Sequence, residues 1–138
     1  AHIAKNAEKY YRSMIGANQS SWNIRDHHMM DTLKRLLDFH GKEAKVIIWE
    51  HNTHVGDARA TNMAHEGSIN VGQLVREQLS DYNPKIVGFG SYQGTVVAGS
   101  EWGAPMRNMI VPPAMEGSWE HLMHQTGILI LTCFDYLF

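Results

Sequence analysis

The sequence of 138 residues has one cysteine, four prolines and no long uninterrupted apolar run. Cys133 has no second thiol with which to form an internal disulfide, so we expect a reducing, cytoplasmic environment. The apolar C-terminal segment is interrupted by Asp135 and is shorter than the roughly 20 residues that span a bilayer. The polar, charged segment from Ala1 to Ile15 does not have the pattern of a secretory signal. We therefore expect neither a membrane span nor export.

The sequence also lacks an excess of charge of either sign. Twelve lysines and arginines stand against fourteen aspartates and glutamates, which gives a net charge of −2. Binding to nucleic acid or to an anionic membrane surface needs a concentration of basic residues, so neither partner is expected. Nine histidines are the unusual feature, because imidazole is the side chain best suited to proton transfer or metal binding near neutral pH.

Four segments carry apolar residues at the spacing of a helix. Their approximate limits are residues 3–14, 21–37, 71–79 and 119–125. Gly41 is a typical C-terminal stop for the second helix, and Ser118 is a typical N-cap for the fourth.

Two apolar runs, Val46–Trp49 and Lys85–Phe89, lie on either side of the third predicted helix. A run without alternation is typical of a strand that is covered on both faces, as in parallel sheets. Strand, helix and strand in this order predict a right-handed βαβ unit. Further strands are expected at Thr95–Ala98 and Ile128–Thr132, and a loop at Trp102–Pro113.

The first predicted strand leads into His51-Asn52-Thr53-His54, the candidate chemical site. Ligands of open parallel sheets bind beyond the carboxyl ends of the strands, so we expect both rings to face one solvent-accessible cleft. There one imidazole can take a proton from water while the other holds or polarises the reacting oxygen. The alternative is a pair of loop histidines satisfied by backbone hydrogen bonds.

Asp57 extends the pair to a His-x-x-His-x-x-Asp array, which is compatible with zinc or a harder divalent metal. Three-residue spacing is common by chance in a chain with nine histidines. We expect Asp57 to be turned away and paired with Arg59 or with backbone amides. We therefore expect no tightly bound metal and no other cofactor.

Two further pairs of polar residues lie on the predicted helices. Glu120 and His124 share a face of the fourth helix, either as a structural pair or to orient an active-site histidine. Arg25 and Asp26 begin a charged turn that, taken alone, is typical of a helix surface. The segment Gly88–Gly94 lacks the glycines of a nucleophile elbow, so it does not support a serine nucleophile.

These residues lie in motifs that resemble those of the erythromycin-esterase-like hydrolases. Trp49 to His54 resembles the W-x-H-N-x-H signature, and Asn23 to Met29 resembles the N-x-R-D-x-x-M helix. Asn70 to Glu77 resembles the N-x-G-Q-x-x-R-E helix, and Gly117 to His124 the closing G-S-x-E-x-x-x-H helix. The motifs occur in the family's order and cover about residues 10–125.

The resemblance implies an α/β fold of three layers with a largely parallel sheet. Residues 1–138 would be a single domain, the C-terminal part of an erythromycin-esterase-like domain. The implied reaction is hydrolysis of a small-molecule ester, a macrolide lactone or a related compound, by histidine-activated water, as in antibiotic resistance. His51 and His54 would be catalytic. Residues expected to bind substrate or support the site are Glu50, Asp57, Arg59, Arg25, Glu120 and His124.

The sequence departs from the family pattern in two ways. The family's Gly-Glu-x-x-His loop, which supplies a glutamate and a general-base histidine, does not occur in it. We therefore expect an incomplete fold whose partner is the N-terminal half of the same fold or a second copy of the chain. Glu50 stands where the family has a small residue and would add a carboxylate to the cleft. The alternatives are a metal-dependent hydrolase that uses His51, His54 and Asp57, and an inactive small-molecule-binding or assembly domain.

Overall fold

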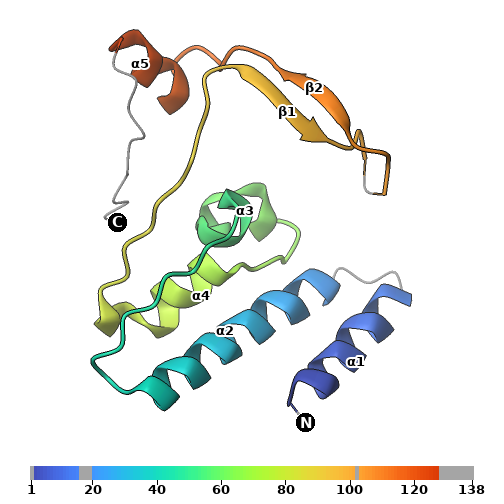
Figure 1. The fold of residues 1–138 in the computed structure, drawn as a ribbon, viewed down its shortest axis with the longest axis vertical. Coiled ribbons are helices and arrows are strands. Elements are labelled where there is room, and N and C mark those ends of the chain that lie inside the picture. Colours follow the sequence, from blue (N-terminus) through green and yellow to red (C-terminus); the bar gives the residue numbers. More distant parts are fainter. Residues whose placement is uncertain (1, 16–19, 102, 128–138) are drawn as a thin grey trace. The chain divides into compact units, whose positions relative to one another are not determined.

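The computed structural model describes residues 2–15, 20–101 and 103–127 (Figure 1). The chain forms two compact units, the first within residues 1–88 and the second beginning at Phe89. The first unit contains the helices α1 (His2–Ile15), α2 (Ser20–His40), α3 (Asn52–Val55) and α4 (Val71–Gln78), with short 3₁₀ turns at Ala58–Ala60, Asn62–Ala64 and Ser80–Tyr82. The second unit contains β1 (Gly94–Ala98), β2 (Arg107–Val111) and α5 (Trp119–Gln125).

All four helices expected from apolar spacing are confirmed. Gly41 ends α2 with a positive φ of 86°, and its N–H donates to the carbonyl of Leu37 at 2.9 Å. This left-handed conformation suits glycine, which has no Cβ to clash. Ser118 caps α5, as expected, by accepting a hydrogen bond from the backbone N–H of His121. Within the described ranges, no helix combines the length and the apolar character that crossing a membrane requires.

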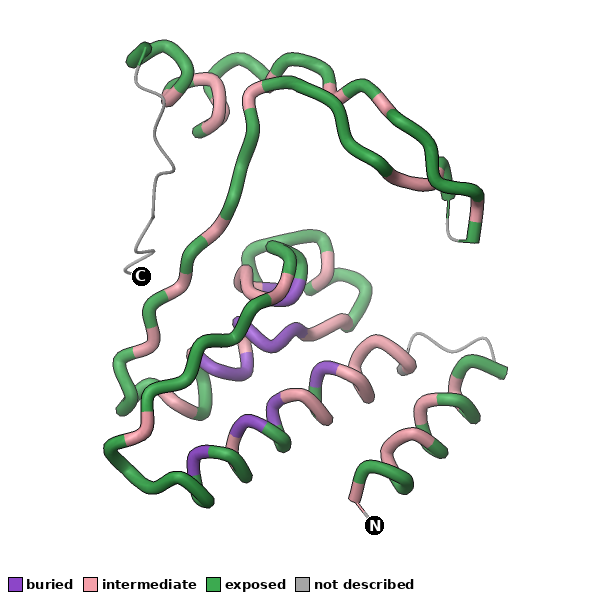
Figure 2. Tube along the Cα trace, viewed as in Figure 1, coloured by how far each residue is buried: buried purple, intermediate pink, exposed green. Residues whose placement is uncertain are grey.

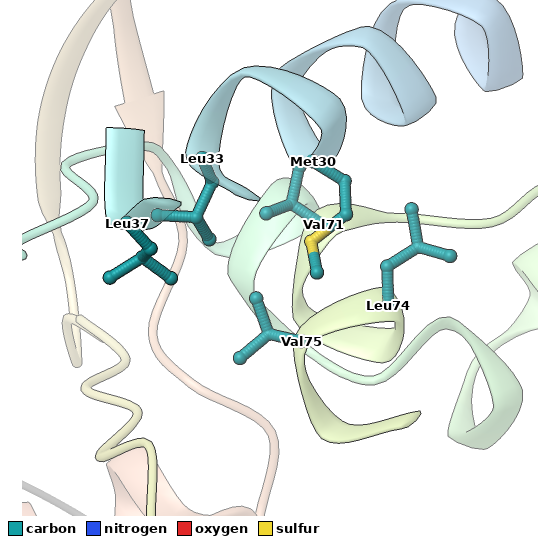
Figure 3. Close-up of a cluster of buried hydrophobic side chains, with 6 residues drawn as sticks. All are labelled: Met30, Leu33, Leu37, Val71, Leu74 and Val75. Carbon is teal, nitrogen blue, oxygen red and sulfur yellow. The ribbon is translucent and has the colours of Figure 1, made fainter. Parts of the chain in front are cut away.

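The buried core of the first unit lies between α2 and α4. It consists of Met30, Leu33 and Leu37 from α2 and Val71, Leu74 and Val75 from α4 (Figure 3). Figure 2 shows the buried positions confined to α2, the segment around α3, and α4. Among the described residues from Phe89 onward, none is buried. The core therefore stabilises the part of the chain that contains both candidate histidines.

The predicted α/β fold of three layers with a largely parallel sheet is wrong. Among the described residues the only sheet is the antiparallel pair β1–β2, and helices predominate. Val46–Trp49 and Lys85–Phe89 adopt no regular secondary structure, so the βαβ unit is absent. Ile47 and Trp49 are 88% and 82% exposed, which contradicts a strand covered on both faces. Apolar composition favours a strand, but a strand also needs a hydrogen-bonding neighbour, which composition cannot supply.

The hairpin of the second unit was predicted only in part. Thr95–Ala98 is confirmed within β1, which pairs with β2 in the register Gly94↔Val111 to Ala98↔Arg107. The segment expected to be a loop, Trp102–Pro113, contains β2, because its prolines bound the strand and do not interrupt it. The expected strand Ile128–Thr132 lies outside the described residues.

We predict that Leu33→Ala lowers the free energy of unfolding by about 2–4 kcal/mol, because it leaves a cavity between α2 and α4. Leu36→Ala on the same helix is the matched control and should cost less than about 1 kcal/mol, because Leu36 is 45% exposed whereas Leu33 is 7% exposed. Urea unfolding followed by circular dichroism measures both. Equal costs for the two substitutions would contradict the assignment of the core.

Candidate active site

One carboxylate joins the three helices around the candidate histidines. Asp26, on α2, is completely buried. Its Oδ2 accepts a hydrogen bond from the backbone N–H of Val71, the first residue of α4, at 3.0 Å. The same oxygen lies 2.9 Å from Nδ1 of His54 on α3. Asp26 therefore satisfies a helix N-terminus and fixes a ring with a single oxygen.

The first turns of α2 are also bonded to the segment that leads into α4. Nε1 of Trp22 donates to the carbonyl of Ile69 at 2.6 Å. The Asn23 side chain donates to the carbonyl of Gly67 at 2.9 Å and accepts from the N–H of Ile69 at 3.0 Å. Asn70, the N-cap of α4, accepts from the N–H of Gln73. These contacts hold the start of α4 next to Asp26.

α3 lies directly on the backbone of α4. A Cβ added to Gly72 would lie 2.0 Å from the carbonyl oxygen of Gly56 and 2.1 Å from that of Val55. Nη1 of Arg76 donates to the carbonyls of Gly72 and Gly56 at 3.0 and 3.1 Å. The Asn70 side chain donates to the carbonyl of Thr53 at 2.8 Å. Only glycine permits this separation, so Gly72 sets the position of α3 and hence of His54.

The two candidate histidines lie side by side but differ in exposure. Their ring centroids are 4.7 Å apart, and the rings are tilted by 39°. His51 precedes α3 and is exposed, whereas His54 is buried, at 6% exposure. The expectation that the two rings face one solvent-accessible cleft at the end of a strand is therefore wrong for His54, and no strand precedes them. The difference follows from their positions before and within α3, because His54 points toward α2 and α4 to reach Asp26.

The ring of His54 is contacted on its face and at both of its nitrogens. Its ring stacks on Trp22 with centroids 4.4 Å apart and planes 3° from parallel. Nη2 of Arg25 lies 3.2 Å from Nε2 of His54, and the Arg25 guanidinium carbon is 4.8 Å from the centre of the Trp22 ring. Arg25 therefore takes part in the site and is not the surface charge that its position alone suggested.

Glu50 adds a second carboxylate beside His54, and its expected role in the site stays a prediction. Its Oε2 lies 3.7 Å from Nδ1 of His54, and its side chain is 18% exposed. Burial raises the pKa of the Glu50 carboxyl above its usual value, and the negative charge of Asp26 acts in the same direction. Its Oε2 makes no hydrogen bond to any described residue. Protonation of Glu50 is therefore easier than that of an exposed glutamate.

Asp57 is paired with Arg59, as expected. Nε and Nη2 of Arg59 donate to its carboxylate at 2.9 and 2.7 Å, and the backbone N–H of Arg59 donates at 3.1 Å. The hydrogen bonds from the Arg59 side chain lower the pKa of Asp57. A second arginine is also near, since Nε of Arg76 lies 3.8 Å from Oδ2 of Asp57. Within the described ranges, no three His, Cys, Asp or Glu side chains are grouped to hold one metal ion.

Glu120 and His124 belong to the second unit. The ring of His124 stacks on Tyr92, with centroids 3.7 Å apart and planes 5° from parallel. The Glu120 side chain lies against Gly90, where an added Cβ would meet its Oε1 at 3.0 Å. Each of the two side chains thus contacts the segment before β1, and their supporting role remains a prediction.

An open pocket of about 360 Å³ lies on the first unit beside α3. Amide and hydroxyl side chains supply most of its polar lining, and neither candidate histidine lines it. Its lining residues are Asn52, Thr53, Gly56, Thr61, Asn62, Met63, Glu66 and Asn70.

Sequence reasoning missed several residues of the site. Trp22 and Asn70 carried no chemical signal, although Asn before an apolar helix is a recognisable N-cap. Asp26 was noted in the charged turn and in the N-x-R-D-x-x-M motif, but it was given no role, and its burial depends on α4, which lies 45 residues further along the chain. Gly72 was noted only as the glycine of the N-x-G-Q-x-x-R-E motif, because the reason for it comes from the backbone of α3.

We predict that Gly72→Ala separates α3 from α4 and lowers the free energy of unfolding by at least about 1–3 kcal/mol, the usual cost of overpacking. Gly88→Ala is the matched control, since its Cβ would meet only the Asn52 side chain, at 3.8 Å. Thermal unfolding measures the difference. If both variants are as stable as the wild type, the close approach of α3 to α4 is not present in solution.

The comparison with known families agrees with this arrangement of motifs. The family model described as erythromycin esterase matches residues 1–135. No solved structure gives a significant match to the chain. Because the match extends over nearly the whole sequence, and includes α2, α3, α4 and α5, the chain belongs to the erythromycin esterase family.

Proposed function

We propose that this chain is an esterase-type hydrolase that acts on a small-molecule ester, a macrolide lactone or a related compound. The family assignment supports a hydrolase of this family. The observation that supports the site is the asymmetry of the histidine pair: His51 is exposed, and the adjacent His54 is buried and contacted at both ring nitrogens. One ring can thus meet water and substrate while the other stays fixed.

In the proposed reaction, the exposed His51 takes the proton of the attacking water, because the Gly-Glu-x-x-His loop that supplies the family's general base does not occur in this sequence. As His51 takes the proton, the water oxygen bonds to the ester carbonyl carbon; the C–O bond to the alcohol then breaks, and His51 returns the proton to the alcohol oxygen. Between these two steps, negative charge develops on the carbonyl oxygen. Arg25 is a cation in contact with the pair, because Nη2 of its guanidinium lies 3.2 Å from Nε2 of His54. We assign Arg25 to the stabilisation of this charge. His54 lies against both His51 and Arg25 and helps to hold them in position.

The metal-dependent alternative has weaker support. It needs Asp57 as the third ligand, but the Asp57 carboxylate is occupied by three hydrogen bonds from Arg59. An inactive binding or assembly domain remains the alternative of a different class. The sequence contains no Gly-Glu-x-x-His, so we further propose that full activity needs a segment with that motif, from a longer chain or from a second protein. In this proposal, the hydrogen bonds between Asp57 and Arg59 stabilise the segment after α3.

We predict that His51→Ala lowers kcat/KM for ester hydrolysis by about 100-fold or more, the usual contribution of a general base. Ring opening of erythromycin, followed by mass spectrometry as the addition of water, and hydrolysis of a p-nitrophenyl ester measure it. His40→Ala is the matched control, because His40 is an exposed histidine at the end of α2.

The assay is made on the 138 residues alone and together with a polypeptide that supplies the Gly-Glu-x-x-His segment. We expect low turnover alone and higher turnover in the combination, since residues that act as a unit lose most of their effect when one is missing. If turnover is within twofold of the wild type in His51→Ala, the assignment of this site is wrong. If neither ester is hydrolysed in either arm, the binding or assembly alternative is favoured.

A further inference from the structure

Asp26 differs from the other carboxylates of the described chain, because it is completely buried and bonded to two elements at once. Both bonds are made by Oδ2, which faces the N–H of Val71 and Nδ1 of His54. Its second oxygen, Oδ1, is buried and makes no hydrogen bond to any described residue. A buried carboxylate costs free energy unless its environment gives it a specific partner. Asp26 meets this condition through Oδ2 alone, since its partners are the N–H of Val71 and Nδ1 of His54.

The contact with Arg25 determines where the proton of His54 lies. A guanidinium group can only donate hydrogen bonds, so Nε2 of His54 must accept from Nη2 of Arg25, 3.2 Å away. In a neutral imidazole, the nitrogen that accepts leaves the proton on the other nitrogen. Nδ1 therefore carries the proton and donates it to Oδ2 of Asp26 at 2.9 Å. The two contacts agree on one tautomer.

Three features make Asp26 suited to select this tautomer. Its carboxylate accepts only, so it favours a proton on the facing nitrogen. The N-terminus of α4 stabilises the negative charge, because the helix dipole is positive there and the N–H of Val71 points at the oxygen. The stacked Trp22 ring opposes rotation of the imidazole about its Cβ–Cγ bond, because that rotation would tilt the ring plane into Trp22.

We propose that Asp26 is a positioning residue that fixes His54 as the Nδ1–H tautomer, and that His54 in this form holds Arg25 against the ring that lies next to His51. His54 then positions Arg25 and does not transfer a proton, since its unprotonated nitrogen, Nε2, accepts the hydrogen bond from Arg25. The consequence for catalysis rests on the proposed hydrolase function, whereas the tautomer itself does not. His51 thus transfers the proton, and His54 holds Arg25 in position.

The direct test is the ¹⁵N spectrum of the histidine ring nitrogens in the full chain. The signals that disappear in His54→Gln identify His54. We expect a single tautomer with the proton on Nδ1 and none on Nε2. A proton on Nε2, or an averaged signal from both tautomers, would overturn the proposal. This test needs no turnover, so it gives a result even if the hydrolase proposal fails.

Substitution of Asp26 tests whether this carboxylate is what fixes the tautomer of His54. Asp26→Leu removes both acceptors at similar volume, and we expect His54 to lose its single tautomer. Asp26→Asn keeps one acceptor and should restore the Nδ1–H signal at least in part. Asp38→Leu, an exposed aspartate on the same helix, is the matched control and should leave the signal unchanged. An unchanged tautomer in Asp26→Leu contradicts the proposal, and if this variant does not fold, the wild-type spectrum decides.

The kcat of His54 variants distinguishes a positioning role of His54 from proton transfer. It is measured on the form of the protein that hydrolyses ester, the chain alone or the combination. The Oε1 of Gln can accept from Arg25 where Nε2 of His54 did, so His54→Gln should retain at least about a tenth of kcat, whereas His54→Leu should not. Loss of kcat to the same level in both would mean that His54 transfers the proton and would overturn its positioning role.

Discussion

The site depends on one carboxylate oxygen that binds two donors. Oδ2 of Asp26 accepts from the N–H of Val71 and from Nδ1 of His54, and so connects α2 to both α4 and α3. The core between α2 and α4 brings Asp26 to the start of α4. The close approach at Gly72 then brings α3, and with it His54, to the same point. Core packing and site geometry are therefore parts of one arrangement.

The difference between the two histidines follows from this arrangement. His51 and His54 begin and end one short helical turn, so their rings lie near each other although only one can reach Asp26. Burial gives His54 fixed partners on both nitrogens, and exposure leaves His51 accessible to a substrate. A spacing of three residues thus produces two chemical environments. The sequence motif alone treats the two rings as equivalent.

Local patterns predicted local structure and failed for structure that depends on distant pairing. Apolar spacing and capping residues located four helices, because a helix satisfies its hydrogen bonds within itself. Val46–Trp49 was expected to be a strand from composition, yet the sheet among the described residues consists of β1 and β2 alone. The motif resemblance identified Arg25, His51 and His54, and the Asp57–Arg59 pair was predictable from proximity. The burial of His54 and the requirement for Gly72 were not, since both result from the packing of α3 on α2 and α4, beyond the range of any local pattern.

Hydrogen exchange at the Val71 amide tests the central interaction most directly. The first N–H of a helix has no acceptor within the helix, so it normally exchanges quickly. Because this N–H donates to the buried oxygen of Asp26, we expect protection close to that of the Leu74 amide, which bonds to the Asn70 carbonyl beside the core. Exchange as fast as that of Lys42, in the exposed turn after α2, would contradict the account.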